Sequence, residues 1–148
     1  MNIEYIVKRF IKCNQRVVHY HDIWELILVC SGKGFVVVDE VQYPVSPGAI
    51  ICIPPAVVHY NVALEECTHI AIRVKGFNNP SQSKIPVFHD DNEKTVQSLA
   101  EIALQKYYSL DVSREEVVGL LCDTIYAVMV SSMHSDIKSP EVERVKNK

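Results

Sequence analysis

The sequence has no excess of positive charge. Its 15 Lys and Arg residues are outnumbered by 18 Asp and Glu residues, which gives a formal net charge of −3. A chain with this balance has no general electrostatic attraction for nucleic-acid phosphates. The sequence also lacks a glycine-rich phosphate loop and a patterned Ser, His and Asp triad. We therefore expect that this segment does not bind phosphates by itself, and we predict no catalytic residues and no enzymatic activity.

The five cysteines follow no pairing pattern. Their number is odd, CxxC is absent, and Cys30 and Cys52 lie inside apolar runs, where cysteine acts as a small hydrophobe. Reduced and mostly buried thiols favour a cytoplasmic protein. The N-terminus has no signal-peptide core. The longest apolar run, 49–58, is broken by Pro54 and Pro55 and is shorter than the roughly 18–20 residues of a membrane helix, so no membrane partner is expected.

Short apolar and β-branched runs fill residues 1 to about 88. Turns that contain Gly or Pro separate them at roughly 8–12-residue spacing, which indicates an antiparallel sandwich or barrel. Several runs are apolar on both faces, as suits a barrel wall that is packed inside and outside. The expected strands are 17–21, 24–30, 35–38, 41–43, 49–53, 57–62 and 69–74, with a last strand at 85–88.

After this β region the apolar spacing becomes helical. One helix is predicted over 93–108 and a second from Ser113 to about Met133. Ser113 and Glu116 have the spacing of a capping box at the start of the second helix. Because the link between the helices is short, we expect an antiparallel pair.

The sequence therefore divides into a barrel over 1–90, a helix pair over 91–135, and a tail over 136–148. Within the tail, Ser139 and Pro140 form a good helix start, yet no cap follows before residue 148. We interpret the tail as a linker and the start of a truncated further domain; the alternative is a frayed natural end.

The second helix carries a broad apolar stripe. One interpretation is that the stripe packs on the first helix and on the barrel. Its width favours a second role as a homodimer interface. The residues predicted for that interface are Val117, Leu121, Ile125, Val128 and Met129.

Three histidines and one glutamate give the strongest chemical signal: His19, His21, Glu25 and His59. His19 and His21 are two residues apart, so on a strand both rings would project from one face. Three imidazoles and a carboxylate that converge on one cavity form a possible divalent-metal site for Zn, Ni, Fe or Mn. Two alternatives stay open: a hydrogen-bonded polar cluster without metal, or direct hydrogen bonding to a small-molecule effector.

Two further side chains, Arg73 and Trp24, have two interpretations each. Arg73 could clamp an anionic effector in the same pocket, although an arginine on a strand more often points to solvent. Trp24 could stack on a ligand, but its parity relative to Glu25 favours packing outside the barrel, under the helices. His69 and His89 are expected at the surface.

The first block of this constellation resembles a signature motif of the cupin superfamily. That motif is His-x-His, three or four residues, Glu, six residues and Gly, and this sequence matches it at His19, His21, Glu25 and Gly32. The resemblance implies a double-stranded β-helix barrel of jelly-roll type, which agrees with the strand pattern. A mainly β fold with a C-terminal helix pair is therefore expected.

The second cupin motif is matched in part. Gly48, Pro54 and His59 stand at its Gly, Pro and His positions. Ala56 replaces a second Gly of the motif, and Ala63 stands where an Asn is usual.

A narrower resemblance covers most of the chain. The sequence is similar to the N-terminal effector-binding domain of AraC-family transcription regulators in four stretches: 21–26, 31–34, 43–50 and 53–59. The order of a barrel, two helices and a linker is also shared. The tail from Pro140 to Lys148 resembles the lead-in to the DNA-binding domain of that family.

The AraC-family resemblance implies a sensing and dimerisation domain. A small-molecule effector would bind in the barrel, with His19, His21, Glu25, His59 and Arg73 as the pocket residues. The helix pair would form the homodimer, and DNA would be bound only through a C-terminal helix-turn-helix domain absent from this chain. The alternative is a metal-dependent cupin enzyme, such as a dioxygenase or an isomerase, in which the metal activates water or dioxygen.

Overall fold

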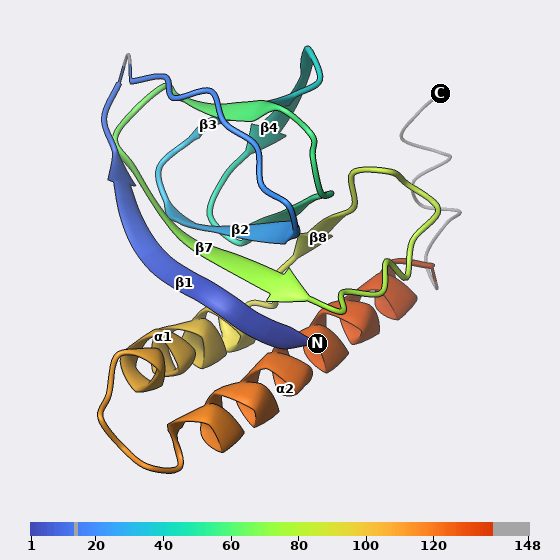
Figure 1. The fold of residues 1–148 in the computed structure, drawn as a ribbon. Helices are drawn as coiled ribbons and strands as arrows, with labels where there is room; N and C mark the ends of the chain where they lie inside the picture. The colour runs from blue at the N-terminus through green and yellow to red at the C-terminus, as the bar shows by residue number, and fades with distance from the viewer. Residues whose placement is uncertain (14, 138–148) are drawn as a thin grey trace.

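The computed structural model describes residues 1–13 and 15–137. In this part of the chain, eight strands are followed by two helices (Figure 1). The elements are β1 Asn2–Ile11, β2 Trp24–Ser31, β3 Gly34–Val38, β4 Val41–Val45, β5 Ala49–Ile53, β6 His59–Ala63, β7 Cys67–Lys75, β8 Val87–His89, α1 Thr95–Tyr107 and α2 Arg114–Ile137. The predicted combination of a mainly β fold with two C-terminal helices is confirmed.

The strands form two antiparallel sheets. The larger sheet has the order β1-β7-β2-β5-β8, and the smaller has the order β4-β3-β6. Figure 1 shows α1 and α2 side by side against the larger sheet, with the smaller sheet on the opposite side. The larger sheet is therefore the middle layer of the molecule.

Both faces of the middle layer are apolar at its centre, as the strand sequences predict. Along β2, β5 and β7, one set of alternate residues packs against the helices and the other set faces the smaller sheet. The helix-side core includes Leu26, Leu28, Ile50, Cys52, Ile70 and Ile72 from the strands and Val96, Ala100, Ala103, Cys122, Ile125 and Met129 from the helices. The core between the sheets contains Ile27, Val36, Val38, Ile51 and Ile53.

The first strand differs from the sequence prediction. The ten-residue strand β1 was not predicted, yet it pairs with β7 from Asn2 to Ile11. Conversely, residues 17–21 do not form a strand, and their one β-bridge joins His19 to His59. Val17 and Val18 are 71% and 58% exposed, so their β-branched side chains have little apolar surface to pack against.

The start of α2 is also corrected. Ser113 does not form the predicted capping box; its hydroxyl donates to Asp111 Oδ1 at 3.0 Å. The Ser113 backbone N–H donates to the same carboxylate oxygen at 3.1 Å. Asp111, only two residues away, thus accepts the Ser113 N–H that a capping box would give to the Glu116 carboxylate.

Part of the predicted dimer stripe lies inside the chain. Ile125 and Met129 are each 1% exposed in the helix-side core, so they cannot contact a second copy in this structure. This corrects their assignment to a dimer interface. Val117, Leu121 and Val128 remain partly exposed. The third helix predicted from Ser139 lies outside the described residues.

Residues Arg114–Met133 have the length and the mean hydropathy, 1.4, of a membrane-spanning helix. A helix packed into the core of a soluble protein meets the same two criteria, and this one packs against the middle sheet through its buried face.

Candidate metal centre

The structure brings together the four residues that the sequence singled out. The ligand atoms of His19, His21, Glu25 and His59 all lie within 4.8 Å of one another. The three imidazole rings are in contact, with centroid distances of 4.2, 4.8 and 5.4 Å. The residues come from the segment before β2, from the start of β2 and from the start of β6.

Backbone hydrogen bonds hold these segments in place. The N–H of His19 donates to the carbonyl of His59 at 3.1 Å, and the N–H of His59 donates back to His19 at 2.9 Å. The carbonyl of His21 accepts the N–H of Ala56 at 2.7 Å. Glu25 lies within the middle sheet, opposite Ile53 on β5 and Arg73 on β7.

Ala56 is one of the two residues that depart from the cupin motif, where a glycine is usual. Its φ is 63°, in the left-handed region where glycine is favoured. An alanine pays roughly 1–2 kcal/mol of steric strain in this conformation. The chain nevertheless turns at Ala56, and this turn places the Ala56 N–H where it donates to the carbonyl of His21.

The two imidazoles that face Glu25 Oε1 are oriented by their own backbone. His19 Nδ1 lies 3.0 Å from the carbonyl of Val17, and His59 Nδ1 lies 3.0 Å from the carbonyl of Val57. Because a carbonyl only accepts, each Nδ1 carries the hydrogen, and in a neutral ring Nε2 then presents an electron pair. His59 Nε2 lies 3.1 Å from Glu25 Oε1, and His19 Nε2 lies 3.9 Å from it.

Electron pairs therefore converge at the centre of the cluster. His19 Nε2 and His21 Nε2 are buried and have no hydrogen-bond partner among the described residues, although His21 Nε2 is 3.1 Å from Glu25 Oε2. Buried polar atoms of this kind are normally satisfied. Additional protons would satisfy them in part. A divalent cation would accept all four ligands at once, and the donor set suits Zn, Ni, Fe or Mn.

The electrostatics of the site fit the same interpretation. Burial alone raises the pKa of Glu25, but the neighbouring imidazoles of His19 and His59 outweigh it and hold that pKa well below its usual value. The nearby Glu25 carboxylate raises the pKa of His19, whereas burial lowers the pKa of His21. The carboxylate is therefore ionised and His21 favours its neutral form, which are the states that bind metal, whereas a protonated His19 would release its proton when metal binds.

Arg73 lies against the cluster. Its Nε donates to Glu25 Oε2 at 3.3 Å, and its guanidinium stacks over the ring of Tyr5 at 4.8 Å from the centroid. The sequence interpretation as a clamp for an anion stays a prediction, with part of the guanidinium already engaged by Glu25.

A hollow of about 280 Å³ opens beside His19. Its lining is Arg9, Phe10, Ile11, Gln15, Val17, His19 and Asn61. Neither Arg9 nor Asn61 belongs to a sequence motif, so the sequence does not predict them as site residues. Arg9 lies beside the hollow only because β1 pairs with β7, and Asn61 is one residue within an otherwise ordinary strand sequence.

The prediction that His69 lies at the surface was wrong. The residue is 3% exposed. It lies on β7, opposite Arg9 on β1 and Val29 on β2, so strands cover it on both sides. Burial, followed by the charge of Arg9, lowers its pKa to about 4.

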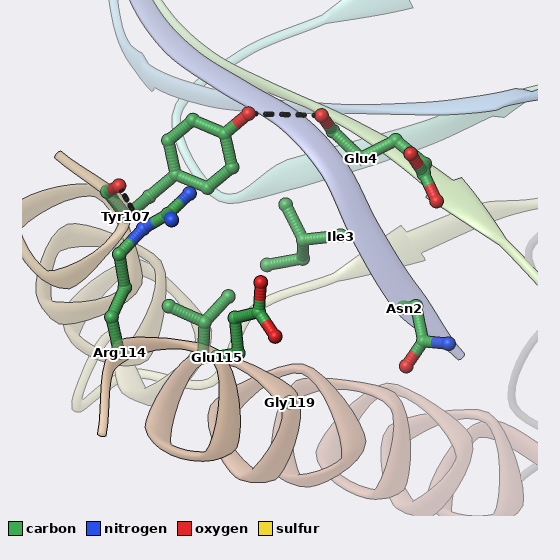
Figure 2. A pocket seen from close by; sticks show the side chains of 8 residues that line it. Asn2, Ile3, Glu4, Tyr107, Arg114, Glu115 and Gly119 are labelled. Atoms are coloured by element: carbon green, nitrogen blue, oxygen red, sulfur yellow. Dashed lines mark hydrogen bonds between the residues drawn. The ribbon is translucent and has the colours of Figure 1, made fainter. Parts of the chain in front are cut away.

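A second hollow, of about 460 Å³, lies between β1 and the helices (Figure 2). It is lined by Asn2, Ile3, Glu4, Tyr107, Arg114, Glu115, Val118 and Gly119. The hydroxyl of Tyr107 donates to the carbonyl of Glu4 at 3.0 Å beside it. No predicted site residue lines this hollow, which lies between β1 and the helices and apart from the metal cluster.

Comparison with known families identifies the part of the chain that holds the cluster. Residues 14–70 match the family model described as the cupin domain. All four residues of the cluster lie within this range. A search of curated proteins found no match.

The solved structures that this chain matches include several cupin proteins. A cupin protein from Bacteroides fragilis is 22% identical, with 56% of this chain and 74% of that chain covered and a TM-score of 0.46. A conserved protein of unknown function from Streptococcus pyogenes is 20% identical, with coverage of 53% and 68% and a TM-score of 0.47. Salicylate 1,2-dioxygenase from Pseudoaminobacter salicylatoxidans is 13% identical, with coverage of 46% and 19% and a TM-score of 0.44.

Proposed function

Given that this chain contains a cupin domain, we propose that it is a metal-dependent sensing domain of a transcription regulator of the AraC type. A divalent cation is held by His19, His21, Glu25 and His59. A small molecule binds in the hollow beside His19. The helix pair forms a homodimer and passes the signal to a helix-turn-helix domain that binds DNA.

The convergence of four ligands carries the metal part of the proposal. Two buried Nε2 atoms lack a partner among the described residues, and the remaining Nε2 faces an ionised carboxylate. A cation removes the repulsion between these electron pairs. The carbonyls of Val17 and Val57 accept from Nδ1 of two rings, as outer groups commonly do for metal-binding histidines.

Strand β1 supports a sensing role because its two faces meet different partners. Arg9 and Ile11 line the hollow beside His19. On the opposite side, Lys8 Nζ is 2.8 Å from Glu101 Oε1 on α1. The hydroxyl of Tyr108 donates to the carbonyl of Ile6 at 2.7 Å. A shift of β1 on ligand binding would therefore act directly on the helices, provided that the ligand binds two arrangements with different affinity.

The outer face of α2 supports a homodimer. Residues spaced by three and four positions along it are uncharged, and Leu120 among them is 68% exposed. They are the exposed Leu120 and Thr124, bordered by Val117, Leu121 and Val128, which are partly buried. This outer face replaces the predicted interface, which included the buried Ile125 and Met129.

The metal is tested by elemental analysis of protein purified without a nickel column. We expect about one divalent ion per chain, and its loss in His21→Ala. His89→Ala is the matched control, because His89 is an exposed histidine outside the cluster. Absence of metal from the wild-type chain after dialysis against Zn, Ni, Fe and Mn salts would overturn this part of the proposal.

The regulatory role is tested on the full-length product of the natural gene. We expect a dimer that selects specific DNA sites, and DNA affinity that changes when the metal or an effector is added. A natural reading frame without a DNA-binding domain would overturn the regulator.

A cupin enzyme is the second candidate, and the position of the hollow favours it. His19 lines the hollow and also belongs to the cluster, so a molecule there would lie next to a bound cation. A bound cation would act as a Lewis acid towards water or substrate. Turnover or dioxygen consumption that is lost in His59→Ala would establish this function in place of the sensor.

A further inference from the structure

We infer that the hollow beside His19 binds the carboxylate of a small organic acid, and that Arg9 is the residue that recognises its charge. This inference rests on the proposed sensing function and names the class of ligand. It is carried by the contrast between two arginines on neighbouring strands, by the lining of the hollow and by the position of His69.

The two arginines differ in their partners. The guanidinium of Arg73 is bonded to Glu25 and stacked on Tyr5. Within residues 1–13 and 15–137, the guanidinium of Arg9 forms no hydrogen bond, ion pair or aromatic stack, yet its side chain lines the hollow. An unpaired, partly buried guanidinium offers two parallel donors, the geometry that suits a carboxylate.

Arg9 is the charged residue in the described lining of the hollow. That lining includes no Asp or Glu. His69 faces Arg9 across the strand pair β1–β7, and the positive charge of Arg9 contributes, after burial, to lowering the pKa of His69. A metal ion bound by the four-residue cluster would add positive charge next to Arg9, so an anion is the favoured occupant of the hollow.

The rest of the lining indicates an acid with an apolar body. Phe10, Ile11 and Val17 provide apolar surface, whereas Gln15 and Asn61 provide amides. Gln15 Oε1 already accepts the N–H of Lys12 at 2.9 Å, which leaves its NH₂ group as a donor. A volume of about 280 Å³ limits the ligand to a small molecule. Inorganic phosphate would leave the apolar surface unused.

The inference is tested by calorimetry on the metal-loaded chain with acetate, propionate, benzoate and phenylacetate as probes. Benzamide serves as the neutral analogue of benzoate. We expect at least one acid to bind, benzamide to bind at least tenfold more weakly than benzoate if benzoate is that acid, and Arg9→Gln to weaken the acid at least tenfold. Arg9→Lys, which keeps the charge but not the paired donors, should lose less affinity than Arg9→Gln.

Arg16→Gln is the matched control. Arg16 carries the same charge a few residues away, but it stacks over the ring of Tyr60 at 4.9 Å and does not line the hollow. The affinity of the Arg16→Gln chain for the acid should stay within twofold of the wild-type affinity. Circular dichroism and metal content must be unchanged in both variants, so that a loss of binding is not a loss of fold.

The outcomes separate this inference from the metal proposal. Equal binding by the wild type and Arg9→Gln, preference for inorganic phosphate, or no binding of any acid would overturn the inference. A chain that takes up no metal but binds an acid in an Arg9-dependent manner would overturn the metal proposal and support the inference.

Discussion

The two faces of strand β7 contribute to different parts of the molecule. Towards the helices, β7 presents Ile70, Ile72 and Val74, which are all buried in one apolar core. Towards the smaller sheet, it presents His69 and Arg73, one beside the Arg9 hollow and one bonded to Glu25. Neighbouring residues of one strand therefore serve either the stability of the fold or the chemistry of the site. A substitution should affect mainly the face on which it lies.

The largest effect on stability is expected on the helix side. Ile125→Ala removes a side chain that is 1% exposed in the helix-side core. We expect the free energy of unfolding to fall by about 2–5 kcal/mol because a cavity is left behind. Urea denaturation followed by circular dichroism measures it. Leu120→Ala, on the exposed side of the same helix, should change it by less than about 0.5 kcal/mol; equal losses would contradict the division between faces.

Removal of the metal tests the contribution of the face of the larger sheet that points towards the smaller sheet. If a divalent ion is held at 100-fold its dissociation constant, its removal by a chelator should lower the free energy of unfolding by about 2.7 kcal/mol. In His21→Ala the chelator should have no effect, since the binding set is incomplete. Thermal unfolding with and without metal measures both. A chelator effect that persists in His21→Ala would place the stabilising ion elsewhere.

His69 predicts a pH dependence in the metal-free chain. Its pKa in the folded state is lowered to about 4, whereas in the unfolded state it is ordinary, about 6.5. Between these values the unfolded chain binds more protons, so stability falls as the pH drops. We expect a loss of about 2 kcal/mol from pH 7 to pH 5 that is absent in His69→Gln. Parallel urea titrations of the two chains would test it, and identical pH slopes would exclude His69 as the cause.

The smallest effect on folding is expected on the outer face of α2. Leu120→Glu should leave the unfolding of the monomer unchanged within about 0.5 kcal/mol, because the side chain is 68% exposed. If α2 forms the homodimer, the same change should weaken dimerisation at least tenfold, since it buries an unpaired charge. Sedimentation over a range of concentrations measures the dimer, and an unchanged dimer would move the interface to another surface.

The sequence predicted the centre of the fold better than its edges. Strands β2, β5 and β7 are recognisable from the sequence because their residues are buried on both faces and form continuous apolar runs. Strand β1 is an edge strand of the larger sheet. Its burial pattern is irregular, and charged residues such as Glu4 and Lys8 interrupt its apolar pattern. Edge strands carry less of the periodic signal on which such predictions depend.

The candidate site divides in the same way. The four-residue cluster was predicted because its spacing is a family motif, although His19 and His21 lie in an irregular segment instead of a strand. Arg9 has no motif around it, and its proximity to His19 arises only from the pairing of β1 with β7. His69 was misplaced because a single polar residue in a strand does not indicate which neighbours cover it.

The packing of Trp24 has an optical consequence. This residue is the one tryptophan of the chain, adjacent in sequence to Glu25, and its ring lies 4.7 Å from that of Phe77. Phe77 in turn contacts Tyr126 on α2 at 5.8 Å. The indole therefore belongs to the seam between sheet and helix pair while its neighbour in sequence belongs to the metal cluster. Its native fluorescence therefore reports, without a label, changes in the packing around Trp24 and Phe77.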